Sequence, residues 1–401
     1  MSTRPAPIQR PRLPYVALGL LWLAALDCRT PLVAIGPLLP VLMIKLHLDS
    51  LVASTATAIP LLLIALISIP AGYLADRHGP RVILVIALGI LTISCAVPLI
   101  SGSIAGLFTF VSGTGIGIGL AQPTLAKMAR HFLPSAPTLP TALYANALVV
   151  GGMVSSLLST PVFLPLAGVW SWRGVIADWG VLVLLATIGW SLQKRDMTVP
   201  TPHYEASRAG LPLLPGFIPI ALAFAGQGAV FYAFVTWLPQ FFVRAGWSIS
   251  SAAIPLAVLS LGSICGGLSA PWVLRIGHGF RKPVIGSALL LALSILGLTQ
   301  VMVFAYLWAW IIGATTAVVF TLGLAAPPEI TFSHNVGRLS GLLLAIGYIG
   351  AVIGPIGYGL VQPLAPNASM FYLIGLSLAI AIAGFFIPSN LRYQSQHGTR
   401  T

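Results

Sequence analysis

Charged side chains are scarce in this chain of 401 residues. They make up 7% of the sequence against 57% hydrophobic residues, and only 7 residues are Asp or Glu. A soluble domain carries about 25% charged residues, so a chain of this composition has too little polar surface to face water. The scarcity excludes an ordinary soluble protein and indicates one that lies in a lipid bilayer.

Motifs of enzymes and metal proteins are also missing. Cys28, Cys95 and Cys265 lie far apart in apolar runs, which excludes a disulfide framework and a metal site with closely spaced cysteines. The sequence has no Gly-Lys dipeptide, hence no phosphate-binding P-loop, and no H-E-x-x-H or G-x-S-x-G motif. We therefore expect no enzyme, no cofactor and no bound metal.

Long apolar runs are abundant. About 20 apolar residues cross a hydrocarbon core of about 30 Å as a helix. We predict twelve membrane helices, and thus an all-α membrane protein, with helices over residues 15–44, 51–75, 82–101, 104–126, 140–164, 174–192, 214–242, 249–274, 283–304, 306–327, 338–363 and 368–388.

A polar stretch divides the runs into two sets of six. It covers residues 194–213 and separates an N-terminal half, 1–193, from a C-terminal half, 214–401. Six helices in each half are typical of transporters built from two related bundles, with the substrate site near the membrane midplane between them.

The positive charges indicate the orientation. Sixteen Lys and Arg residues fall on one side of the predicted helices, and three, Lys45, Arg173 and Arg244, on the other. Because cytoplasmic loops carry the excess of Lys and Arg, we predict a multi-pass protein of the cell (inner) membrane with both termini in the cytoplasm. The net charge of +13 is spread in small groups. We expect no nucleic-acid partner.

One segment resembles a known family. The residues Gly72-Tyr73-Leu74-Ala75-Asp76-Arg77-His78-Gly79-Pro80-Arg81 are similar to the G-x-L-A-D-R-x-G-R-R signature of the major facilitator superfamily, in the loop expected after 51–75. The resemblance implies a cytoplasmic gate in which Asp76 faces the start of the 338–363 helix and latches the outward-open state. Gly72 would permit close helix approach and Gly79 a tight turn. The gate residues implied are Gly72, Asp76, Arg77, Gly79, Arg81 and Arg338.

Shorter motifs resemble one branch of that superfamily, the cyanate and nitroimidazole permeases. They are Cys28-Arg29-Thr30-Pro31 with Gly36-Pro37-Leu38-Leu39, the stretch 231–239, and the glycines of 117–119 and 341–354. The chain departs from that pattern at Leu120, where we expect Asn, and at Leu344, where we expect Gln. The resemblance implies a small substrate such as cyanate or a nitro or carboxylate compound.

Arg29 is the first candidate for substrate binding. It follows Asp27, which lies 12 residues, about 18 Å, beyond Tyr15 and so near the midplane. Burying an arginine there costs about 2.5–3.5 kcal/mol, so it needs a partner or a water-filled cavity. Its planar fork of donors suits a carboxylate or similar anion. The alternative is a structural ion pair with Asp27, which requires a helix break that Pro31 would supply.

Two roles for Asp27 stay open. It is either a proton carrier or the group that neutralises Arg29 in the empty site. Asp178, near the end of its helix, is predicted to be structural. The glycines spaced by four in 113–119 and 350–354 are interpreted as helix-packing pairs.

Uncharged candidates come from the helices that the superfamily resemblance implies to line the cavity. They are polar or aromatic side chains in those helices, namely Gln122, Tyr144, Asn146, Gln227, Tyr232, Trp237 and Tyr348.

We therefore predict a secondary active transporter that moves a small, anionic organic or inorganic solute by alternating access, with proton coupling as an open question. Its expected partners are a small-molecule substrate, the bilayer and protons, and it is expected to be a monomer. The alternatives are a transporter-like sensor without turnover, a proton-driven efflux pump for drug-like compounds, and uncoupled facilitated diffusion.

Overall fold

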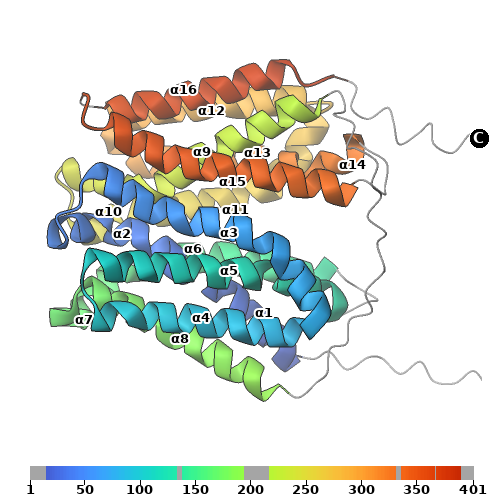
Figure 1. The fold of residues 1–401 in the computed structure, drawn as a ribbon. Helices are drawn as coiled ribbons and strands as arrows, with labels where there is room; N and C mark the ends of the chain where they lie inside the picture. The colour runs from blue at the N-terminus through green and yellow to red at the C-terminus, as the bar shows by residue number, and fades with distance from the viewer. Residues whose placement is uncertain (1–14, 133–137, 194–215, 331–335, 366, 390–401) are drawn as a thin grey trace, which may run out of the picture.

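The computed structural model describes residues 15–132, 138–193, 216–330, 336–365 and 367–389. Within these ranges the chain is helical and contains no strand. The long helices run side by side along one direction (Figure 1). Twelve segments of the described chain are long and apolar enough to cross a membrane, which confirms the predicted count and the all-α class.

The helices of the first half form eight labelled elements with two short irregular turns. Their bounds are α1 Tyr15–Asp27, α2 Thr30–Lys45, α3 Ser50–His78, α4 Pro80–Ile100, α5 Ile104–Phe132, α6 Thr138–Leu158, a π-helical turn Ser159–Phe163, α7 Leu164–Ala167, a 3₁₀ turn Gly168–Trp170 and α8 Trp172–Leu192.

The second half also contains eight labelled helices and one short turn. Its bounds are α9 Phe217–Arg244, α10 Ile249–Ala252, α11 Ile254–Ile276, α12 Arg281–Gln300, a 3₁₀ turn Met302–Phe304, α13 Ala305–Ala325, α14 Pro327–Ile330, α15 Val336–Val361 and α16 Ala368–Phe385. The predicted polar stretch 194–213 lies outside the described residues.

The helices pack as two bundles. In the first bundle α4 lies against α5 and α8, and α5 also lies against α3; in the second, α11 pairs with α13, α9 with α15 and α12 with α16. The most extensive contacts between the bundles are those of α2 with α9, α3 with α15 and α6 with α11. Residues on these helices therefore lie where the two bundles meet.

Glycines set the close helix contacts within each bundle. A Cβ added to Gly115 would lie 2.7 Å from the Cα of Pro60 in α3, and one added to Gly117 would lie 2.9 Å from the carbonyl oxygen of Ala87 in α4. Gly350 on α15 is in even closer contact with the backbone of α9. The predicted packing role of these glycines is confirmed, because a side chain at any of them would push two helices apart.

Helix α3 is longer than predicted. We expected it to end at residue 75, whereas it continues to His78, so Asp76 and Arg77 lie on its last turn. No residue in 72–77 breaks a helix, and only Gly79 turns the chain, with a φ of 87°, before α4 begins at Pro80. The prediction that Gly79 permits the tight turn is confirmed.

The two ends of the structure differ in charge. We name the end that carries Arg77, Arg81, Arg275 and Arg281 the basic end, and the opposite end, with Lys45, Arg173 and Arg244, the far end. At the far end the guanidinium of Arg173 stacks on the ring of Trp170 at 5.1 Å.

Candidate functional site

The first membrane span is broken in its middle. Helix α1 ends at Asp27 and α2 begins at Thr30, so Cys28 and Arg29 lie between two helices. Pro31 lacks the N–H that would bond to the carbonyl of Asp27, which explains the break. The predicted departure from helix at Pro31 is confirmed, but it does not bring Arg29 into an ion pair with Asp27, whose carboxylate oxygens have no hydrogen-bond partner among the described residues.

Helix α6 supports the break from one side. The hydroxyl of Ser155 donates a hydrogen bond of 2.7 Å to the carbonyl oxygen of Thr30. A Cβ added to Gly151 would lie 2.6 Å from the carbonyl oxygen of Leu26 and 3.1 Å from the Cβ of Arg29. The position of Arg29 therefore depends on the absence of a side chain at Gly151.

Replacing Gly151 by alanine should destabilise the protein by about 1–3 kcal/mol, because the added methyl group overpacks this contact. The neighbouring change Gly152→Ala is the control, since its Cβ would lie 3.7 Å from the nearest atom, an ordinary contact. Thermal unfolding in detergent measures both. Equal melting temperatures for the two variants would contradict the assigned contact.

Arg29 contacts the opposite bundle. Its Nη1 donates a hydrogen bond of 2.9 Å to the hydroxyl of Tyr232 on α9. Tyr348 on α15 and Tyr144 on α6 lie near the same guanidinium. The three tyrosines pack against one apolar cluster that includes Leu26. Arg29 thus lies between the bundles, surrounded by phenols from three helices.

A second polar contact joins the bundles beside Arg29. The hydroxyl of Tyr348 donates a hydrogen bond of 3.3 Å to Oε1 of Gln122 on α5. Five of the predicted residues, Arg29, Gln122, Tyr144, Tyr232 and Tyr348, therefore come together in one cluster, which we name the central cluster.

Asp27 is fully buried and makes no ion pair with Arg29. It is 0% exposed, and neither carboxylate oxygen has a hydrogen-bond partner among the described residues. A charged carboxylate without a partner is costly in an apolar environment. In this conformation no described group neutralises or hydrogen-bonds the carboxyl group of Asp27.

Three predicted residues lie outside the central cluster. The Oδ1 of Asn146 accepts a hydrogen bond of 3.2 Å from the indole of Trp22 on α1. Gln227 is 5% exposed within α9. The indole N–H of Trp237 donates to the carbonyl oxygen of Pro355 at 3.2 Å, and its ring stacks on Tyr358. In this conformation Trp237 joins α9 to α15 and does not face Arg29.

The bundles touch at the far end. The hydroxyl of Ser50 at the start of α3 donates a hydrogen bond to Oε1 of Gln362, just after α15. Next to it Gly359 has no room for a side chain, because an added Cβ would overlap the hydroxyl of Ser54. Gly36 on α2 is equally close to the backbone of Val235 on α9. These contacts close the far end.

The same helices separate toward the basic end. Figure 1 shows α3 bending away from α15 there, and α3 contains Pro60 and Pro70, which bend a helix. A Cβ added to Gly72 on α3 or to Gly341 on α15 would have no atom within 4 Å. Gly72, predicted at a close helix approach, makes none in this conformation.

Of the other predicted gate residues, the structure describes the side chains of Arg77 and Arg81. Arg77 is exposed. Arg81 donates to the carbonyl oxygens of Trp190 at 3.2 Å and Ser191 at 2.7 Å, and so caps the C-terminal end of α8. The side chains of Asp76 and Arg338 lie outside the described residues, so the predicted latch stays a prediction.

Gly359→Ala should prevent closure of the far end and favour the opposite conformation. Spin labels at Leu51 and Leu360, both exposed, would report a longer distance in this variant than in the wild type. Gly341→Ala on the same helix is the control, because its Cβ meets no atom within 4 Å. Unchanged distances in Gly359→Ala would show that this contact does not control closure.

Sequence reasoning missed several polar contacts. Trp22, Ser155 and Gln362 bind other helices, but none of them belongs to a motif that would single it out. Only the helix pairing shows which partner each one meets.

Twelve membrane helices in two bundles that meet around the partly buried Arg29 are the architecture of a secondary transporter. The family model described as Major Facilitator Superfamily matches residues 21–355. The chain belongs to this superfamily, in agreement with the resemblance of the 72–81 segment.

Known proteins agree with this class. The chain is 23% identical to the cyanate transport protein CynX of Escherichia coli, covering 92% of this chain and 95% of that one. It is 26% identical to the 2-nitroimidazole transporter of the same species, covering 91% and 93%. A bacterial homologue of the human lysosomal transporter Spinster, solved in an inward-facing, occupied conformation, has the same fold, with a TM-score of 0.75, 18% identity, and coverage of 94% and 96%. These proteins are transporters, as is the superfamily, and none is an enzyme.

Proposed function

We propose that this transporter carries a small anionic solute, which binds at Arg29 between the two bundles. The observation that carries the proposal is the environment of this arginine. Its guanidinium faces tyrosine hydroxyls and pairs with no carboxylate among the described residues. An arginine near the midplane that lacks an anionic partner is prepared to receive one from the substrate.

The surrounding tyrosines support a small, flat substrate. Tyr144, Tyr232 and Tyr348 offer aromatic faces and hydroxyl groups around a single positive charge. Cyanate, and carboxylates or nitro compounds on a small ring, fit this combination of charge and shape. The names of the two relatives from Escherichia coli agree with such substrates.

The contacts of the central cluster support a link between binding and movement. Both the Arg29–Tyr232 and the Tyr348–Gln122 hydrogen bonds join opposite bundles. An anion that accepts hydrogen bonds from Arg29 competes with Tyr232 for the same donors. Substrate binding therefore changes the contact between the bundles, as alternating access requires.

Asp27 is proposed as the proton-coupling site. It is buried, lacks a partner in this conformation and lies two residues from Arg29. When the bundles move, water that reaches Asp27 would hydrate its carboxylate, so that the proton is released. Protons and substrate would thus cross together, in symport.

The orientation is proposed from charge. The basic end faces the cytoplasm, since Lys and Arg are enriched there. With the far end closed, the conformation faces inward, and both termini lie on the cytoplasmic side of the inner membrane.

Uptake into proteoliposomes tests the proposal. Benzoate, cyanate and benzenesulfonate are compared with the neutral compounds benzamide and benzenesulfonamide, and uptake by protein-free vesicles is subtracted. We expect protein-dependent uptake of at least one anion and none of the neutral compounds. Binding without uptake would instead favour a sensor, and equal uptake of neutral and anionic compounds would contradict an anion transporter.

A further inference from the structure

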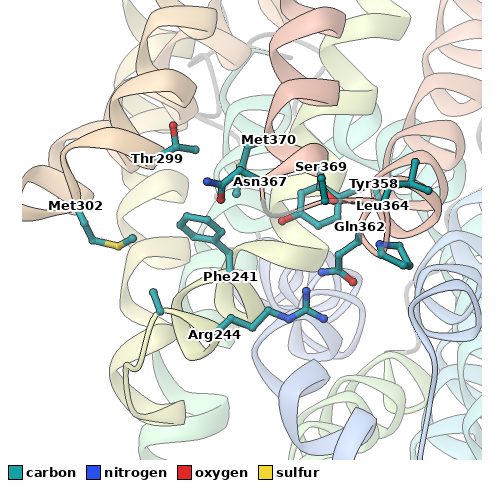
Figure 2. A pocket seen from close by; sticks show the side chains of 13 residues that line it. Phe241, Arg244, Thr299, Met302, Tyr358, Gln362, Leu364, Asn367, Ser369 and Met370 are labelled. Carbon is teal, nitrogen blue, oxygen red and sulfur yellow. Dashed lines mark hydrogen bonds between the residues drawn. The ribbon is translucent and has the colours of Figure 1, made fainter.

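A cavity of about 610 Å³ opens at the far end of the second bundle. We name it the far-end pocket; it is formed by the C-terminal ends of α9 and α15, the connection between α12 and α13, and the start of α16 (Figure 2). It contains no residue of the central cluster. Its residue Tyr358 lies ten positions after Tyr348 on α15, about 15 Å along the helix.

The pocket contains a positive charge that the protein does not neutralise. Arg244 is exposed at the end of α9 and makes no hydrogen bond or ion pair with the described residues. Tyr358, which is 3% exposed, lines the same pocket and lies near this charge. Figure 2 shows the guanidinium of Arg244 directed toward the side chain of Gln362.

The start of α16 adds to the positive potential. This helix of 18 residues begins at Ala368, and its first turn, with Asn367 and Ser369, lines the pocket. The Asn367 side chain does not cap the helix. The N-terminal end of a helix carries a partial positive charge and favours anions. Arginine and helix end together therefore favour an anionic group in this cavity.

Gln362 connects the pocket to the contact between the bundles. Its Oε1 accepts the hydrogen bond from Ser50 on α3, which leaves the N–H groups of the amide as donors. An anion in the pocket that accepts from this amide would hold Gln362 in the orientation that keeps Ser50 bound.

We propose that the far-end pocket is a second anion site, which binds a carboxylate or phosphate group through Arg244, Tyr358 and Gln362. The group belongs to a free solute or to a lipid headgroup. This second site is separate from Arg29. It depends on the proposed function in one respect, the orientation in which the far end faces the outside of the cell.

Protection of a cysteine tests this site. Thr299→Cys places a thiol in the lining of the pocket, in a Cys265→Ser background because Cys265 is exposed. In phosphatidylcholine nanodiscs, benzoate should slow modification of this thiol by an uncharged polyethylene glycol maleimide, about tenfold at ten times its dissociation constant. Benzamide should have no effect. Phosphatidylglycerol nanodiscs without benzoate test the headgroup as the source of the anion.

Two arginine variants show which arginine is responsible for the protection of the thiol. Arg244→Gln should remove the protection, while Arg29→Gln should leave it intact. Protection in neither kind of nanodisc, protection that survives Arg244→Gln, or protection that Arg29→Gln removes would overturn the proposal. Arg29→Gln also tests the two sites separately. Loss of anion uptake with retained protection of the thiol agrees with both proposals. Uptake at the wild-type level by Arg29→Gln would contradict only the proposed function.

Discussion

Replacing Arg29 by glutamine is expected to weaken the apparent affinity for the transported anion about 100-fold. A hydrogen bond to a charged group contributes roughly 1.5–3 kcal/mol, and the guanidinium offers two in parallel. A loss of about 3 kcal/mol corresponds to roughly a 100-fold change, since each 1.4 kcal/mol is tenfold. Initial uptake rates over a range of anion concentrations measure the effect.

Arg29→Lys separates charge from geometry. Lysine keeps the positive charge but lacks the planar fork, so we expect an affinity between those of wild type and glutamine variant. Arg173→Gln is the matched control, because Arg173 stacks on Trp170 at the far end and contacts no residue of the central cluster. Uptake by Arg29→Gln equal to that of Arg173→Gln would show that Arg29 does not bind the substrate.

Asp27→Asn is expected to abolish accumulation against a gradient while exchange of substrate continues. Asparagine has nearly the shape of a protonated aspartic acid, so the variant should fold and bind, but it carries no proton. A pH difference of one unit stores about 1.4 kcal/mol per proton, enough for roughly tenfold accumulation with one proton per substrate. The test uses the anion that the wild type takes up fastest, with the membrane potential clamped.

Two controls accompany Asp27→Asn, a variant of Asp178 and the wild type without a pH difference. Asp178 is partly exposed on α8, so Asp178→Asn should accumulate substrate like the wild type. The wild type should lose accumulation when the pH difference is removed. Tenfold accumulation by Asp27→Asn would contradict Asp27 as the proton-coupling site.

Much of the fold could be predicted from the sequence because the bilayer imposes length and apolarity on each span. The twelve helices, the break before Pro31 and the glycine contacts at Gly115 and Gly117 depend on local chemistry that is visible in one chain. Helix α3 extends three residues beyond the predicted span, to His78, because the apolar run ends at residue 75 whereas the helix continues until Gly79 turns the chain.

The candidate site could be predicted only in part. Arg29 and Asp27 stand out in the sequence because charged residues are rare in membrane spans. Which tyrosines meet Arg29 depends instead on how α6, α9 and α15 pack around it. Tyr232 and Trp237 belong to one motif and one helix, yet Tyr232 faces Arg29 while Trp237 binds the backbone of Pro355. Five residues on a helix correspond to a rotation of about 140°, so neighbours in a motif need not share a site.

The central claim, that Arg29 binds the anion, is tested most directly by ligand-dependent thermal stability. The comparison is made in an Arg244→Gln background, in which the far-end pocket cannot contribute, with and without Arg29→Gln. A panel anion at 100 times its dissociation constant should stabilise the protein that retains Arg29 by about 2.7 kcal/mol, and its neutral analogue should not. With Arg29→Gln added, the stabilisation should disappear. Equal stabilisation of both proteins by the anion would contradict the account.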